Sequence, residues 1–286
     1  MFAVLKACNR NVNCSKMSGH VLVSNRMCVM GLLHTLDGGE ISLEIDVDQG
    51  ARISSIRFRE FECAVPFRGQ SLTWGWYAMA PWAGRIKDGL IKDKSGRQFQ
   101  LPINLAAPHA IHGFGITSSW EDLGNGSFGL DFPEPYRGAR VEQRYEILDN
   151  ALRWSLEYES GDCELPFWMG FHPWFPRELD RGGSAEIEFH PGKMLERGPD
   201  YLPTGKLITP TPSPWDDAFT EVRGTPTVYW EDVMQIKIES DAPYWVVYDQ
   251  DSDGVCVEPQ TAPPDAANLE ISGDTYLEAL FVFDEI

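Results

Sequence analysis

The fold of this chain is decided by an aromatic stretch, Leu165-Pro166-Phe167-Trp168-Met169-Gly170-Phe171-His172-Pro173-Trp174-Phe175. One histidine lies among the aromatic residues, and a proline follows it directly. The proline disfavours the helical region for His172 and predicts an extended backbone there. Flat apolar side chains of this kind either pack a core or face a sugar ring. His172 is therefore either a satisfied, half-buried histidine at a strand end or a general acid held in a cleft.

Short alternating segments lie on both sides of this stretch. Ile41–Val47 and Ala51–Phe58 are separated by a turn, and Ile41–Val47 alternates apolar and polar residues with period two. Val141–Ile147 and Leu152–Glu159 alternate in the same way around another turn. Further extended segments are predicted at Gly89–Leu101 (a hairpin), Ala185–Phe189, Met234–Glu239, Trp245–Tyr248, Val255–Glu258 and Leu277–Phe283.

Two segments have the composition of loops. Asn104–Gly115 is rich in Pro, Ala and His, and residues 196–226 are rich in Pro, Gly and Thr. No long stretch after residue 40 has clean helical periodicity. Many short strands with regular turn signals are typical of an all-β sandwich or barrel. Because no linker is evident, residues 38–286 are expected to form one large domain.

The N-terminal segment differs from the rest of the chain. Its first 33 residues carry basic side chains but no acid, and they include Cys8, Cys14 and Cys28. A signal peptide would need a compact apolar segment and a small-residue cleavage site, and neither is clear here. Residues 1–37 are therefore predicted to be a poorly ordered or atypical extension. A start codon assigned too early, with Met17 or Met27 as the real start, is the alternative interpretation.

Composition narrows the classes of function. The formal net charge is -19, with 43% hydrophobic and 23% charged residues, as in soluble globular proteins. Such a charge repels nucleic acids and anionic membrane surfaces, and no apolar run is long enough for a membrane helix. Cys63, Cys163 and Cys256 are scattered and form no Cys-x-x-Cys pair. They predict free thiols in the reducing cytoplasm, without a disulfide framework or zinc site.

Four residues are candidates for chemistry: Arg85, His112, His172 and Glu258. Glu258 ends a predicted strand, precedes a proline and shares a strand face with Cys256, which suits a general base. It could equally be a surface acid at a strand end. His112 is followed by glycine, which would let a ligand approach the backbone, although a loop histidine that caps a turn has the same pattern. Arg85 could simply pair with an acid.

Metal-binding patterns are incomplete. Asp249–Gly254 imitates the start of a calcium loop, but Gln260 occupies the position where a bidentate glutamate is required. His109 and His112, with His172 and Glu258, could bind a metal in a β-barrel enzyme, yet no tight His-x-His cluster is present. The chain also has no phosphate-binding or dinucleotide-binding glycine motif. We therefore expect neither a metal nor a cofactor.

Four motifs together give the chain a resemblance to a known family: Pro81-Trp82-Ala83-Gly84-Arg85-Ile86, His109-Ala110-Ile111-His112-Gly113, Gly170-Phe171-His172-Pro173-Trp174-Phe175 and Val257-Glu258-Pro259-Gln260. In this order they resemble the aldose 1-epimerase (galactose mutarotase) family, from about residue 38 to the C-terminus. The resemblance implies a large antiparallel β-sandwich of the supersandwich, galactose mutarotase-like type. It also implies an isomerase that needs no cofactor.

The resemblance also implies roles for individual residues. Mutarotation needs an acid for the ring oxygen and a base for the anomeric hydroxyl, and these would be His172 and Glu258. His112 would bond the ring oxygen or a neighbouring hydroxyl, and Arg85 would hold hydroxyl groups. An acid of the segment Trp215–Phe219 would bind substrate, with Asp216 preferred and Asp217 as the alternative. Trp82 and Trp174 are candidates for stacking on the sugar, although either could be plain core.

Two departures from the family pattern bear on the substrate. Gly84 stands where the family often has asparagine, which leaves the preferred sugar open. Ile116 stands near the position where hexose-6-phosphate 1-epimerases typically have an arginine, so a free aldose is expected. The alternatives are a hexose-6-phosphate 1-epimerase, a non-catalytic carbohydrate-binding protein on the same fold, or a metal-dependent enzyme. The expected partner is a monosaccharide, bound by a monomer or homodimer.

Overall fold

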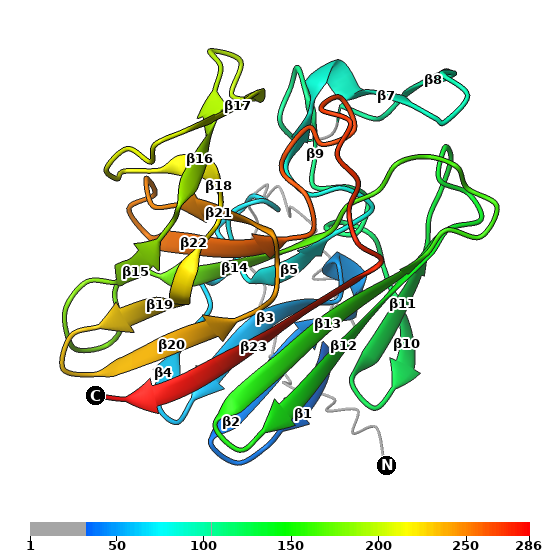
Figure 1. Ribbon diagram of the computed structural model, residues 1–286. Helices are drawn as coiled ribbons and strands as arrows, with labels where there is room; N and C mark the ends of the chain where they lie inside the picture. The colour runs from blue at the N-terminus through cyan, green and yellow to red at the C-terminus, as the bar shows by residue number, and fades with distance from the viewer. Residues whose placement is uncertain (1–32, 104) are drawn as a thin grey trace, which may run out of the picture. The chain divides into compact units, whose positions relative to one another are not determined.

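Strands are the main regular secondary structure of the described chain (Figure 1). The structure, a computed structural model, describes residues 33–103 and 105–286. Helical backbone in this part is confined to two 3-10 turns, η1 (Val47–Gln49) and η2 (Lys87–Gly89). No helix among the described residues is long and apolar enough to cross a membrane. The predicted extension up to residue 32, with its three cysteines and both alternative start positions, lies outside the described residues.

The larger sheet contains eleven strands in the described chain. Its spatial order is β1 (Leu33–Asp37), β2 (Ile41–Asp46), β3 (Arg52–Phe58), β5 (Trp76–Met79), β14 (Gly170–Pro176), β22 (Gly254–Gln260), β21 (Tyr244–Tyr248), β18 (Asp216–Thr220), β16 (Lys193–Arg197) and β17 (Pro203–Ile208), with β4 (Phe61–Glu62) paired to β3. All of its recorded ladders are antiparallel. This order places β14, which carries His172, directly beside β22, which carries Glu258.

The second sheet contains eight strands in the described chain and packs its apolar face against the first. The aromatic rings of Trp154 and Phe171 lie 4.2 Å apart, and those of Trp76 and Phe281 lie 4.8 Å apart. The prediction of an all-β antiparallel sandwich is therefore confirmed. The order of the second sheet is β10 (Glu121–Gly124), β11 (Ser127–Asp131), β12 (Arg140–Leu148), β13 (Ala151–Glu159), β23 (Tyr276–Glu285), β20 (Met234–Glu239), β19 (Arg223–Trp230) and β15 (Glu186–His190).

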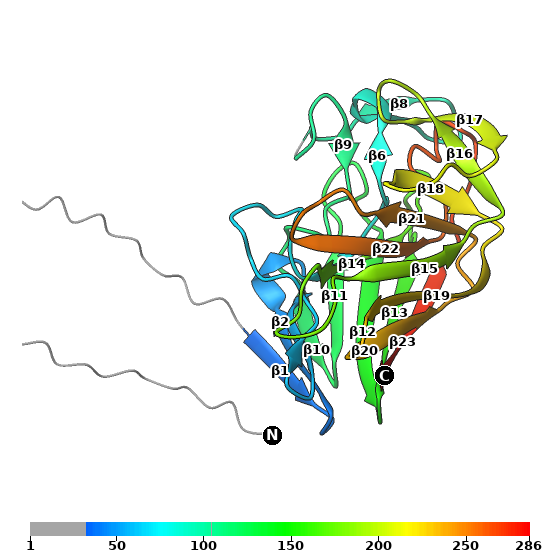
Figure 2. The same ribbon diagram turned by 90° about the vertical axis from the view of Figure 1, so that its left-hand side faces the viewer.

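Two small ribbons complete the fold at one end of the molecule, where Figure 2 also shows β16 and β17. One ribbon pairs β6 (Arg85–Ile86) with β9 (Ala110–Ile111), so that Arg85 faces Ile111 in the ladder. The other pairs β7 (Leu90–Lys92) with β8 (Gln98–Gln100) and confirms the predicted hairpin between residues 89 and 101. The first ribbon brings Arg85 and the residue after β9, His112, to the same part of the structure.

Strand β14 divides its side chains between the core and a cavity, as the alternation of a strand requires. Phe171 and Phe175 contact Trp154 and Trp76 between the sheets. His172 points to the other face. Pro173 has no N–H group to donate, and the recorded pairing of β14 with β22 skips from Gly170 to Trp174. The sheet is therefore interrupted beside His172.

Three sequence-based expectations differ from the structure. The first five described residues, Leu33–Asp37, form β1 and pair fully with β2, although they were expected to belong to the extension. The predicted loop over residues 196–226 contains β17, β18 and the start of β19. Some of its Gly and Thr residues, such as Thr204, Gly205, Gly224 and Thr225, occupy exposed strand positions, which need no apolar alternation. Strands β10 and β11 were not predicted, because β10 is short and polar.

Candidate active site

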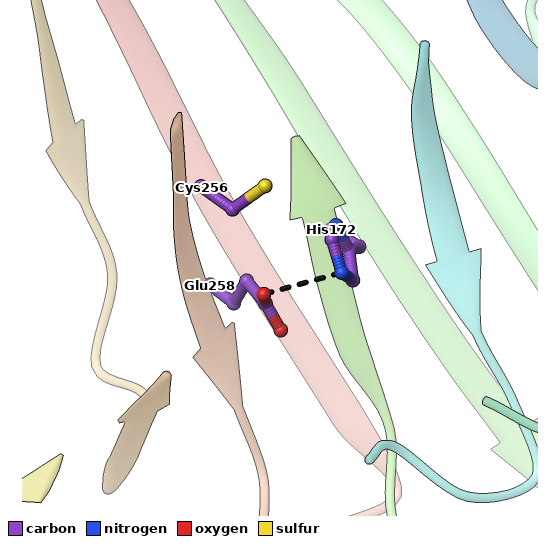
Figure 3. Close-up of side chains that lie close together, drawn as sticks. All are labelled: His172, Cys256 and Glu258. Atoms are coloured by element: carbon purple, nitrogen blue, oxygen red, sulfur yellow. Dashed lines mark ion pairs between the residues drawn. The ribbon is translucent and has the colours of Figure 1, made fainter. Parts of the chain in front are cut away.

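The centre of the candidate site is a contact between the two strands at the interruption. Nε2 of His172 lies 3.2 Å from Oε1 of Glu258 (Figure 3). The two residues are only 6% and 2% exposed. The structure thus brings together the predicted acid and the predicted base, which are separated by more than eighty residues in the chain.

A cavity of about 280 Å³ opens over this pair. This volume is near the lower end of the ~300–1,000 Å³ typical of small-molecule sites and suits one sugar ring better than a chain of sugars. Of the seven predicted site residues, six line the cavity: Arg85, His112, His172, Trp174, Asp216 and Glu258. Asp217, the alternative to Asp216, also lines it.

The environment of the pair favours the uncharged form of both side chains. Burial raises the pKa of Glu258 well above its ordinary value, and the negative charge of Asp216 adds to this effect. A hydrogen bond from the side-chain amide of Gln260 at 3.1 Å opposes it. Burial, followed by the positive charge of Arg52, lowers the pKa of His172 to about 3. A proton shared by the pair is therefore held more strongly by Glu258.

His112 is fixed as a hydrogen-bond donor towards the cavity side of the pair. Its backbone N–H donates to the carbonyl oxygen of Gly84 at 3.0 Å, and the N–H of Gly84 donates to its Nδ1 at 3.2 Å. Burial lowers the pKa of His112 well below its ordinary value, so the ring is neutral. Because Nδ1 accepts a hydrogen bond, Nε2 carries the proton. The ring meets His172 edge-on, with centroids 5.1 Å apart.

The two glycines of these motifs are required by packing. A Cβ on Gly113 would lie 2.0 Å from the carbonyl oxygen of Ala80, so this glycine serves close backbone packing instead of the ligand approach expected from the sequence. Gly84 has φ +69° and a Cβ there would lie 2.7 Å from the ring of Pro264. An asparagine at Gly84 would therefore clash, which gives a physical reason for the departure from the family pattern.

Asp216 and Asp217 are held by an arginine that sequence reasoning missed. Arg197, the last residue of β16, places Nη1 3.0 Å from Asp216 and Nε 3.1 Å from Asp217. Its single charge balances one of the two aspartate charges, and its ion pairs hold both carboxylates at the cavity wall. Arg197 lay inside the predicted loop, so no local pattern pointed to it.

The two candidate tryptophans have different environments. Trp174 lines the cavity, and its ring lies nearly parallel to His172 at 5.6 Å. Its indole N–H donates to the carbonyl oxygen of Leu72 at 2.7 Å, which fixes the ring plane. Trp82 is fully buried, packs against Phe114 at 5.3 Å and does not line the cavity. The proposed stacking role of Trp82 is therefore wrong, because its ring belongs to the core.

His172, Cys256 and Glu258 are the set among the described residues whose donor atoms lie close enough to hold a metal, within 4.8 Å of one another (Figure 3). A thiolate and a carboxylate are the metal-binding forms of the last two. Burial instead raises the pKa of Cys256 and of Glu258 well above their ordinary values, which favours the protonated groups. Without a bound cation, the cluster therefore presents an acid–base pair with a protonated thiol beside it.

The calcium-like segment forms a different contact. Arg68 pairs with Asp251 at 3.1 Å and with Asp253, so an arginine already binds two of its carboxylates. Arg177 donates to the carbonyl oxygens of Asp249 and Asp251 at 2.7 and 2.9 Å. These contacts make the segment a turn fixed by arginines.

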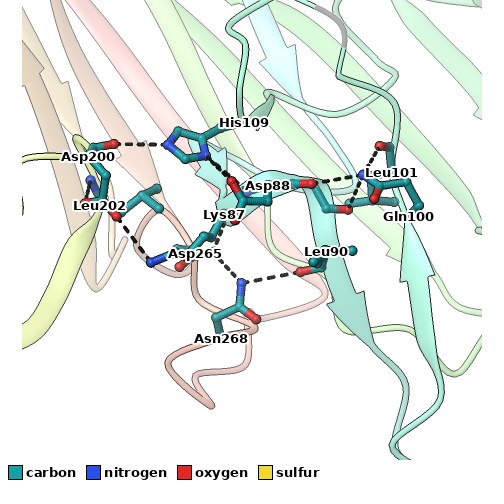
Figure 4. A network of polar contacts seen from close by, with 11 residues as sticks. Lys87, Asp88, Leu90, Gln100, Leu101, His109, Asp200, Leu202, Asp265 and Asn268 are labelled. Carbon is teal, nitrogen blue, oxygen red and sulfur yellow. Dashed lines mark hydrogen bonds and ion pairs between the residues drawn. The ribbon is translucent and has the colours of Figure 1, made fainter.

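A polar network supports one side of the cavity mouth (Figure 4). Asp88 N–H donates to Nδ1 of His109 at 3.1 Å, which leaves Nε2 of His109 as the donor to the carbonyl oxygen of Asp200 at 3.1 Å. Lys87 Nζ lies 3.3 Å from the carboxylate of Asp200. The next residue, Tyr201, lines the cavity and lies beside the guanidinium of Arg85, with 5.7 Å from Cζ to the ring. The predicted metal-binding candidate His109 is thus a structural residue of the cavity mouth.

Comparison with known proteins agrees with this architecture. A family model described as aldose 1-epimerase matches residues 34–279, and the chain belongs to this family. The chain is similar to the uncharacterized protein YphB of Escherichia coli strain K12, at 25% identity over 173 residues, which span 58% of each protein.

Two solved structures are similar to the described fold. One is a galactose mutarotase-like protein from Clostridium acetobutylicum, with a TM-score of 0.72 and 16% identity, covering 88% of this chain and 95% of that one. The other is an aldose epimerase homologue from C. elegans, with a TM-score of 0.73 and 15% identity, covering 89% and 99%. At this identity, the likeness establishes the fold.

Proposed function

We propose that the protein is an aldose 1-epimerase that interconverts the α and β anomers of a free aldose. The observation that carries this proposal is the buried contact between His172 and Glu258 at the base of a cavity sized for one sugar ring. An acid and a base that face the same small cavity are the groups that ring opening and closure require. A protein that only binds sugar has no need of this pair.

In the proposed mechanism, protons move at two oxygen atoms of the sugar. With the cyclic sugar bound, the shared proton first passes from Glu258 to His172. His172 then gives it to the ring oxygen while the Glu258 carboxylate takes the proton of the anomeric hydroxyl, and the ring opens to the aldehyde. Rotation about the C1–C2 bond presents the other face of the aldehyde, and the reverse transfers close the ring. His112 donates from Nε2, Arg85 and Asp216 bind hydroxyl groups, and Trp174 covers one face of the ring.

The charge of the cavity supports an unphosphorylated substrate. Arg197 is engaged by Asp216 and Asp217, and Ile116 is fully buried and does not line the cavity. Arg85 is therefore the cation of the cavity lining that has no recorded ion pair. The carboxyl group of Glu258 lines the same cavity. A phosphate carries close to two negative charges and would lack a basic pocket here.

Polarimetry tests the proposal. Freshly dissolved α-D-glucose and α-D-galactose should reach rotational equilibrium faster with the protein than without it, and Glu258→Gln should abolish the acceleration. Response to a sugar 6-phosphate alone would favour the hexose-6-phosphate 1-epimerase. Sugar binding without acceleration for any aldose or its 6-phosphate would replace the enzyme by a carbohydrate-binding protein.

A further inference from the structure

Arg52 is a buried cation without a role in the proposed mechanism. It lies on β3, is 0% exposed, and its recorded hydrogen bonds all go to backbone carbonyl oxygens. Nε donates to Gln49, Nη1 to Ser71 and Trp74, and Nη2 to Ile116, at 2.9 to 3.0 Å. These bonds satisfy four of the five N–H groups but do not neutralise the charge, and Asp46, opposite Arg52 on β2, is an anionic group that interacts with it. Burial lowers the pKa of Arg52 only to about 10, so the guanidinium stays charged at neutral pH.

The ring of Tyr77 connects Arg52 to the active-site pair. Cζ of Arg52 lies 4.7 Å from the centroid of this ring, and the ring of His172 lies nearly parallel to it at 4.6 Å. Tyr77 is itself 0% exposed. A full positive charge is thus separated from the imidazole by one buried aromatic ring, in an interior where charges interact more strongly than in water.

The other groups near the imidazole of His172 do not offset the positive charge of Arg52. Its Nδ1 is buried and has no hydrogen-bond partner, so an imidazolium would leave a charged N–H unsatisfied. On the side of Glu258, the carboxylate of Asp216 acts in the opposite sense and raises the pKa of Glu258. The titratable and charged groups that face His172 are Glu258 and Cys256 on β22, Tyr77 on β5, Arg52 on β3, and His112 after β9, with Arg85 on β6 acting on His112.

We propose that Arg52 is a positioning residue for the proton of the active site. Its charge keeps the imidazole of His172 neutral in the resting enzyme, so that the proton shared by the pair lies on Glu258. This inference rests on the proposed mutarotation. Burial and the charge of Arg52 are also the two causes that lower the pKa of His172.

In the resting enzyme His172 is neutral and Glu258 is protonated, and ring opening produces the same protonation state of the pair. When the ring opens, His172 has given its proton to the ring oxygen and Glu258 has received one from the anomeric hydroxyl. The pair then consists of a neutral imidazole and a carboxylic acid, and no proton is gained or lost overall. The charges around the pair therefore match the complex with the open-chain aldehyde, the high-energy intermediate, better than the complex with the cyclic sugar.

The first test is NMR titration of the full chain labelled with ¹⁵N-histidine. The chain has six histidines, and His172→Asn identifies the signal of His172 by its loss. We expect His172 in the wild type to stay neutral down to about pH 5. Titration near its ordinary pKa of ~6.5 would overturn the proposal. This measurement needs no turnover, so it stands even if no sugar is epimerised.

The second test compares Arg52→Gln with Arg52→Lys. The glutamine removes the charge and should raise the titration midpoint of His172 by about 1 pH unit, while the lysine keeps the charge and should restore it. The acid limb of the kcat/KM profile should move in the same way, because the doubly protonated pair is inactive. An unmoved midpoint in folded Arg52→Gln contradicts the proposal. If that variant does not fold, Arg52→Met, which also removes the charge, replaces it in the same titration.

Discussion

Each member of the His172–Glu258 pair transfers its own proton in the proposed reaction. His172→Asn and Glu258→Gln should therefore each lower kcat by at least ~100-fold, the scale of one general acid or base. Polarimetry with α-D-galactose measures the effect. Near-normal turnover in either variant would remove that residue from its role.

A second histidine–glutamate contact supplies the matched control. His190 Nε2 lies 3.3 Å from Glu188 Oε1, and both side chains are well exposed. His190→Asn and Glu188→Gln should leave turnover unchanged. A similar loss in these variants would mean that the assay reports general damage and not the loss of a transferred proton.

Local sequence signals predicted the residues at the centre of the site but not those around it. His172 and Glu258 each precede a proline in a strand, and Arg85 and His112 lie in short motifs, so each carries a pattern. Gln260 shares a strand face with Glu258 at period two and could have been found by that signal. Arg197 carries no such pattern, because its role arises only when β16 pairs with β18.

At the scale of elements, strands with one buried face could be predicted from alternation. Val141–Ile147 and Leu152–Glu159 correspond closely to β12 and β13, whose buried residues recur at every second position. Strands β17 and β18, with the end of β16 and the start of β19, were hidden in a segment rich in Pro, Gly and Thr. Their pairing depends on partners far away in the chain, such as β21, and a local pattern does not contain that information.

The turn after β9 depends on Gly113. Gly113→Ala should lower the free energy of unfolding by more than the ~1–2 kcal/mol of an alanine in left-handed backbone, because its Cβ would also meet the carbonyl oxygen of Ala80. Gly124→Ala is the control, since Gly124 also has positive φ but nothing within 4 Å of its Cβ. Urea denaturation measures both. Equal losses would show that the backbone at Ala80 moves aside.

The network at the cavity mouth should affect sugar binding more than chemistry. His109→Ala removes the hydrogen bond to Asp200 and frees the turn that carries Tyr201. KM should rise roughly fivefold, the equivalent of one net hydrogen bond, with kcat nearly unchanged. The exposed His190→Ala serves as the control for kinetics. A fall in kcat at constant KM would instead connect His109 to the proton-transferring pair.

At the scale of the whole molecule, the buried histidine makes stability depend on pH. The pKa of His172 falls from 6.5 to about 3 on folding, so the unfolded chain binds a proton between these values and the folded chain does not. Stability is therefore lost as pH falls below about 6.5, and this group alone contributes about 2 kcal/mol between pH 8 and pH 5.

Urea denaturation of wild type and His172→Asn at both pH values isolates this contribution. The variant should lose about 2 kcal/mol less than the wild type on acidification. Glu258 acts in the opposite sense: its raised pKa lets the folded chain keep a proton that the unfolded chain releases, so its contribution declines as pH rises above about 4.5. Parallel losses in the two proteins would show that His172 is protonated alike in both states.

The acid–base pair lies on neighbouring strands in the middle of the larger sheet, whereas Tyr201 and Gln250 reach the cavity from connecting segments. This division makes the protein a suitable starting point for directed evolution. A library randomised at residues 198–203 and 249–252 would vary the sugar that is selected while the proton-transferring machinery stays in place. Selection for faster equilibration of rare pentoses or deoxy sugars would show whether these two segments set the sugar preference.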